Sequence, residues 1–85
     1  MKGEKAQVKR KQRMDLIISS IENANSKGNV VDLKKAVAVF SLELNVERRT
    51  ILEYLDTLKC AGKLFIVGNN MALAKYKNLI KRGLF

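Results

Sequence analysis

The sequence predicts a small, mainly α-helical domain with one β-hairpin, and two observations support this fold class. Apolar residues recur at helical spacing in three separate segments between residues 14 and 61. Farther along, two aliphatic runs flank Gly68–Asn69–Asn70, a sequence typical of a tight hairpin turn. An 85-residue chain has room for one thin core, so every element must contribute an apolar face to it.

A basic arm of residues 1–13 leads into the first expected helix, which we place from about Val8 to Ala24. The helix starts inside the arm, because the arm consists largely of good helix formers. It should end before Gly28, where polar and small residues give stop signals. Its apolar face follows the spacing i, i+3, i+4, i+7 and consists of Met14, Ile17, Ile18 and Ile21.

The second helix is expected to follow a very short extended piece at Val30–Val31. Asp32 suits its N-cap position, since a carboxylate accepts hydrogen bonds from the free N–H groups of a first helical turn. Leu44 closes this helix. The apolar face repeats at helical spacing and consists of Leu33, Ala36, Val37 and Phe40.

Asn45 is the expected turn between the second and third helices, because asparagine tolerates a left-handed backbone better than any residue except glycine. Val46 should then pack back onto the core. The third helix runs from about Glu47 to Ala61, with Glu47 in its first turn and Gly62 as its C-terminal stop. Its recurring apolar residues are Ile51, Leu55 and Leu58.

The rest of the chain is expected to form a β-hairpin and one more short helix. Lys63–Val67 and Met71–Ala74 are the two strands, joined by the turn at residues 68–70. The last helix is suggested by Tyr76, Leu79 and Ile80, which are surrounded by basic residues.

The formal net charge of +9 is distributed unevenly along the chain. Residues 1–13 contribute +5 and residues 62–85 another +5, whereas the segment between them is close to neutral. Basic ends attract polyanions through counterion release, which favours nucleic acid as the partner. The alternative is that the lysines only keep a small protein in solution.

Residues suited to catalysis or metal binding are scarce. The chain has no histidine, one cysteine, eight dispersed acids and no glycine-rich phosphate-binding loop, so we expect no enzyme activity, no cofactor and no metal site. The single cysteine, Cys60, excludes an intrachain disulfide, and we expect it to be a small packing residue on the third helix. No stretch is apolar enough to cross a membrane, and the basic N-terminus lacks the apolar segment of a signal peptide.

In chain order the expected elements are helix, short strand, helix, turn, helix and hairpin. The features that define this order are the Asp32 cap, the corner at residues 44–46, the pattern RRTI…YL..L…G.L from Arg48 and the turn at residues 68–70. On these features residues 14–74 resemble the winged helix-turn-helix superfamily, which has a three-helix core and a β-wing. Residues 1–13 then form an arm ahead of the domain, and residues 75–85 a basic and apolar segment behind it.

The resemblance implies that the third helix enters the major groove of double-stranded DNA. Arg48 and Arg49 in its first turn are the expected contacts, one to a base edge and one to a phosphate. The alternative is that both arginines are solvated and pair with Glu47 or Glu53. On the same helix, Thr50 is either a phosphate contact or a half-buried spacer.

Other expected contacts surround this helix. Tyr54 either reaches a phosphate or packs against the wing, and Lys34 and Lys35 open the second helix, where related folds meet the DNA backbone. The wing turn has no basic residue and can contribute only hydrogen bonds from Asn69 and Asn70. The arm supplies non-specific attraction, either as a fixed helix or as a segment that orders on binding, through Lys9, Arg10, Lys11 and Arg13.

We therefore expect a cytoplasmic, nucleoid-associated transcriptional regulator. It would bind duplex DNA as a homodimer formed through the first helix or residues 76–85, and no small-molecule ligand is evident. Two alternatives remain open. Glu53, Asp56 and the uncharged wing suit a winged-helix module that binds another protein, and the lysine-rich ends suit a basic protein associated with RNA or ribosomes.

Overall fold

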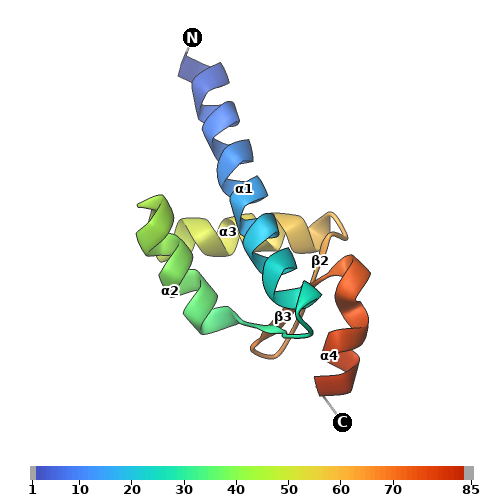
Figure 1. Cartoon of the computed structure of the whole chain (residues 1–85). Helices are drawn as coiled ribbons and strands as arrows, with labels where there is room; N and C mark the ends of the chain where they lie inside the picture. Colours follow the sequence, from blue (N-terminus) through green and yellow to red (C-terminus); the bar gives the residue numbers. More distant parts are fainter. Residues whose placement is uncertain (1, 84–85) are drawn as a thin grey trace.

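The chain folds into a bundle of helices against a small antiparallel sheet (Figure 1). The computed structural model describes the backbone of residues 2–83 and the side chains of residues 9–80. The elements are, in order, α1 (Lys2–Ser26), β1 (Val31–Asp32), α2 (Leu33–Leu44), α3 (Arg48–Cys60), β2 (Leu64–Val67), β3 (Asn70–Leu73), the short 3₁₀ helix η1 (Ala74–Tyr76) and α4 (Lys77–Gly83).

The three strands lie in the order β1–β3–β2, so β3 is the central strand. Val31 is opposite Met71 across β1 and β3, and Val67 is opposite Asn70 across β2 and β3. The hairpin turn therefore has two residues, of which the first, Gly68, has a φ of 62°, as a type II′ turn requires. The predicted fold class is confirmed: the architecture is compatible with a winged helix-turn-helix whose wing is the β2–β3 hairpin.

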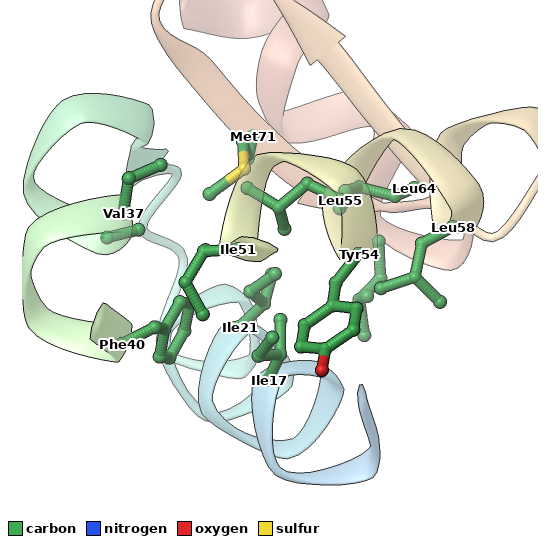
Figure 2. Packing of buried hydrophobic residues seen from close by; sticks show 12 residues of the cluster. Ile17, Ile21, Val37, Phe40, Ile51, Tyr54, Leu55, Leu58, Leu64 and Met71 are labelled. Carbon is green, nitrogen blue, oxygen red and sulfur yellow. The ribbon is translucent and has the colours of Figure 1, made fainter. Parts of the chain in front are cut away.

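The core forms where α1, α2 and the sheet meet the inner face of α3 (Figure 2). The helical faces predicted from apolar spacing are confirmed as buried faces. Five apolar residues from these segments pack against the border of the core and are half-buried: Met14, Ile18, Leu33, Leu44 and Val46. The buried members of the core from the helices are Ile17, Ile21, Ala36, Val37, Phe40, Ile51, Tyr54, Leu55 and Leu58.

The corner between α2 and α3 is built as predicted. Asn45 has φ 54° and ψ 48°, which is the left-handed region, and its backbone N–H donates to the Ser41 carbonyl. Ser41 also closes the corner from the other side, because its hydroxyl donates to the Val46 carbonyl at 2.6 Å. The two helices are therefore joined by a fixed turn.

Three local expectations need correction. The first helix begins at Lys2 rather than near Val8, so the whole described part of the arm is helical. Glu47 is the N-cap of α3 and not a member of its first turn, and its side chain makes no capping hydrogen bond. Cys60 is exposed rather than packed, because it lies two positions after the buried Leu58 and so on the opposite side of the helix.

Asn25 is the one buried polar side chain among the described residues, with 2% of its surface exposed. Its side-chain NH₂ donates to the Asn29 carbonyl at 2.8 Å, and its Oδ1 accepts from the Leu73 N–H at 2.9 Å. Extending the β1–β3 register would bring Asn29 opposite Leu73. The amide therefore continues, through a side chain, the pairing of β3 with a strand that is only two residues long.

We predict that Asn25→Ala will lower the free energy of unfolding by about 1–3 kcal/mol, because the Leu73 N–H and the Asn29 carbonyl would both lose their partner. Urea unfolding followed by circular dichroism measures this change. The matched control is Asn23→Ala on the exposed face of the same helix, which should change the stability by less than about 0.5 kcal/mol. Equal losses in the two variants would contradict the bridging role of Asn25.

Candidate nucleic-acid interface

The third helix buries one face and leaves its first turn open to solvent. Its buried residues are Ile51, Tyr54, Leu55 and Leu58, which hold the helix against the core. Arg48 and Arg49 both project from the N-terminal turn as exposed side chains, and Thr50 beside them is half-buried. Leu52, one turn after Arg48, is also exposed although it is apolar. The open end of α3 therefore combines two guanidinium groups with one aliphatic side chain.

The two arginines differ in their surroundings. Arg49 Nε lies 4.0 Å from Glu53 Oε1, one helical turn on, with 86% and 67% of the two side chains exposed. Such an exposed pair contributes little to stability and is easily exchanged for another partner. Arg48 forms no ion pair with any described residue. Arg49 thus fits the alternative in which the arginines are solvated and pair with an acid of the same helix. Arg48 has no such partner among the described residues.

Tyr54 connects α3 to the basic arm. Only 5% of its surface is exposed, and its hydroxyl oxygen accepts a hydrogen bond from Arg13 Nη1 at 3.2 Å. The guanidinium carbon of Arg10 lies 5.7 Å from the centre of its ring, which is cation–π geometry. Figure 2 shows the ring reaching from α3 towards α1 beside Ile17. The polar partners of Tyr54 therefore lie on α1, which the sequence did not indicate, while its ring belongs to the same buried cluster as Leu64 of the wing.

The arm is the free N-terminal half of α1. Lys9, Arg10 and Lys11 are exposed, and Arg13 is half-buried where the helix reaches the core. Figure 1 shows this half of α1 running past α3 and away from the hairpin and α4. Residues 2–13 of a continuous helix span about 18 Å. The contacts of Arg10 and Arg13 with Tyr54 fix the direction of this helical segment relative to α3.

The N-terminus of α2 is already occupied by hydrogen bonds from within the chain. Asp32 Oδ1 accepts from the Lys35 N–H at 3.1 Å, which confirms the predicted N-cap. Asn69 supplies the other acceptors: its carbonyl takes the Leu33 N–H at 2.8 Å, and its Oδ1 takes the Lys34 N–H at 3.2 Å. These N–H groups are not available to a phosphate, so only the exposed side chains of the two lysines remain for contact.

The contacts at the N-terminus of α2 also lower the pKa of the Asp32 carboxyl group. The hydrogen bond from the Lys35 N–H, followed by one from the Asn69 side chain, holds the pKa of the Asp32 carboxyl below its ordinary value. A carboxylate is thus kept charged beside Lys34 and Lys35. It weakens the local attraction of α2 for a phosphate backbone.

The hairpin turn lies against α2 instead of projecting as a free wing. Asn69 is exposed, but its carbonyl and Oδ1 already serve the first turn of α2. Asn70 is half-buried in β3, opposite both Asp32 and Val67. The side chain of Asn69 therefore has a structural partner within the chain, and Asn70 belongs to the central strand, which no local sequence pattern indicated.

The C-terminal basic segment is also partly engaged. Lys75 forms an ion pair with Glu22 of α1, and this hydrogen bond raises the pKa of the Lys75 ammonium. Its Nζ lies 5.5 Å from the centre of the Tyr76 ring. Lys75 thus fastens the chain after β3 to α1. Leu84 and Phe85, the last two residues of the segment 76–85 that was expected to form a dimer, lie outside the described residues.

Within residues 2–83, no helix is both long enough and apolar enough to cross a bilayer. Among the side chains of residues 9–80, no group of three acidic or cysteine residues is placed to hold a metal ion. In comparisons with known proteins, no family model, curated protein or solved structure matches the chain. The candidate interface is therefore supported only by the placement and contacts of its residues in this structure.

We predict that Asp32→Asn will flatten the acid side of the stability profile. Because the folded-state pKa of Asp32 is lowered, the unfolded chain binds its proton first as the pH falls. The contribution of the ionised Asp32 carboxylate to the stability of the fold is therefore complete above the unfolded-state pKa. It is lost as the pH falls through the lower, folded-state pKa. Urea unfolding between pH 6 and pH 2 should show a steeper loss for the wild type, and parallel curves would contradict this assignment.

We also predict that Tyr54→Phe will loosen the arm without unfolding the domain. The variant keeps the ring under Arg10 but removes the acceptor for Arg13, a loss of about 0.5–1.5 kcal/mol. Amide hydrogen exchange at residues 10–13 should become several-fold faster. Tyr76→Phe, which alters a half-buried tyrosine outside α3, is the control and should leave this exchange unchanged.

Proposed function

We propose that the protein binds double-stranded DNA, with the N-terminal turn of α3 in the major groove and the basic arm of α1 along the phosphate backbone. The joint at Tyr54 is the observation that carries this proposal. One α3 side chain, largely buried, contacts both Arg10 and Arg13 of the arm. A groove-reading element and a charged element are thereby held in one rigid unit, as a DNA-binding surface requires.

The end of α3 that carries the arginines is the part suited to read bases. Farther along the helix Glu53 and Asp56 are exposed, and these carboxylates would repel phosphates if the helix lay lengthwise in the groove. Insertion by the N-terminal turn keeps them outside. Arg48 is then the expected contact to guanine, and Arg49 can leave Glu53 for a phosphate. Leu52 is placed to contact a thymine methyl group, a role that apolar side chains take in the major groove.

Affinity must come mainly from the arm. Residues 46–61 contain three basic and three acidic residues, so the third helix has no net charge to attract a polyanion. Lys9 and Lys11 are exposed and belong to the same free half of α1 as Arg10. Two charges of this kind would displace about two counterions from duplex DNA.

The experiment is a salt titration of binding to a duplex selected by the wild-type protein from a randomised pool. Arg48→Ala/Arg49→Ala should weaken binding to the selected duplex at least ten-fold and reduce its preference over random sequence, because base contacts contribute about 1–3 kcal/mol each. Lys9→Ala/Lys11→Ala should weaken binding to all duplexes alike and lower the salt slope by about two.

The control is Lys27→Ala/Lys59→Ala, which also removes two exposed charges. Lys27 lies beyond the C-terminal end of α1 and Lys59 in the last turn of α3, away from the proposed contacts. If this variant loses as much affinity as the other two, general charge and not the proposed surface determines binding. Preference for structured RNA over duplex would favour the RNA-associated alternative, and stoichiometric capture of a protein without duplex binding would favour the protein-binding module.

A further inference from the structure

β2 is an edge strand with one side unpaired. β3 pairs with β2 on one side and with β1 on the other, so the outer side of β2 has no strand partner among the described residues. Exposed edges of this kind are templates for pairing with another strand unless they are covered. Four residues, Leu64–Val67, form this edge, and none of them is a proline or a charged residue.

The register shows which backbone groups face outwards. The Ala74 N–H donates to the Lys63 carbonyl at 3.0 Å, and Val67 and Asn70 flank a two-residue turn. Hydrogen-bonded pairs alternate along an antiparallel ladder, so the backbone groups of Lys63, Phe65 and Val67 point towards β3. Those of Leu64 and Ile66 point away from β3. The free edge therefore presents two N–H donors and two carbonyl acceptors.

The side chains at this edge are apolar and partly open. Phe65 is 41% exposed and Val67 is 39% exposed, whereas the side chain of Leu64 belongs to the core and is fully buried. Phe65 and Val67 line a groove of about 180 Å³ together with Lys77 and Ile80 of α4. Among the described residues the strand thus has both unpaired backbone groups and a partly exposed apolar face.

We propose that a second copy of this chain covers the edge, by antiparallel pairing of β2 with β2 about a two-fold axis at Phe65. In this register Leu64 of each copy is opposite Ile66 of the other, and the outward groups of both residues pair in four hydrogen bonds. Phe65 faces its own copy at a non-hydrogen-bonded position, where side chains approach most closely. The two three-stranded sheets become one sheet of six strands.

Length and charge favour a second β2 over an unrelated strand. Gly62 and Gly68, both with positive φ, bound the edge, and a second β2 has the same short length. Lys63 would lie opposite Val67 of the other copy, so no like charges face each other. The two Lys63 side chains would start about 13 Å apart along the strands, beyond the Debye length of about 8 Å at physiological salt. The arm points away from the hairpin and α4, so it stays free in such a dimer (Figure 1).

The test is a register-specific cross-link in a Cys60→Ser background, which removes the single native thiol. Phe65→Cys/Cys60→Ser should form an intersubunit disulfide readily under mild oxidation, because directly opposed Cα atoms at such a position are about 4.5 Å apart and within disulfide reach. Val67→Cys/Cys60→Ser is the matched control. Its two thiols would be about 13 Å apart, so it should cross-link at least ten-fold more slowly.

The oligomeric state gives an independent measurement. Sedimentation equilibrium of the wild type should show a dimer of about 19 kDa, twice the chain mass of 9.6 kDa. Phe65→Lys, which places two ammonium groups on the axis, should give folded monomers by mass and circular dichroism. A monomeric wild type at 100 µM, or equal cross-linking at positions 65 and 67, would overturn the proposal. Neither measurement depends on DNA binding.

Discussion

The burial of α3 against α1 is the contact on which the rest of the molecule depends. Ile17 and Ile21 of α1 belong to the same buried cluster as Ile51 and Leu55 of α3, and all four side chains are almost completely removed from solvent (Figure 2). Burying an aliphatic side chain of this size contributes about 1.5–3 kcal/mol. This contact decides which face of α3 remains outside, and hence that Arg48 and Arg49 are exposed. It also fixes the axis of α1, so the free half of that helix has one direction.

Electrostatics divides the candidate site into two parts. The outer surface of α3 has arginine at its beginning and acids farther along, whereas the arm is basic without interruption from Lys9 to Lys11. A helix with balanced charge has little long-range attraction for DNA but can discriminate at short range. Long-range attraction is then left to α1. Lys75 is paired with Glu22, and Asp32 lies beside Lys34 and Lys35, so an acidic group within the chain offsets part of the charge at these three lysines.

The sequence predicted what short-range patterns determine. Helical faces follow from apolar spacing, the corner from the backbone preference of Asn45, and the hairpin turn from Gly68. What it did not predict are the partners of single polar side chains. Tyr54 bonds to Arg13 across 41 positions, Asn69 to Lys34 across 35, and Asn25 to Leu73 across 48.

Such contacts depend on how the elements pack against one another, and the spacing of residues along one helix carries no information about that packing. The error for Cys60 has a different origin. Leu58 is buried, but positions two apart on an α-helix lie about 200° from each other, so Cys60 is on the exposed side of α3.

The two proposals constrain each other through rigidity. A sheet of six strands formed across β2 would fix the distance between the two copies of α3, because each α3 packs on its own sheet through buried Leu58 and Leu64. Each arm would keep its direction through Tyr54. A dimer of this kind could not adjust the separation of its two reading elements, so it would accept only half-sites at one spacing, related by two-fold symmetry. Selectivity would then reside as much in the geometry of the sheet as in the arginines.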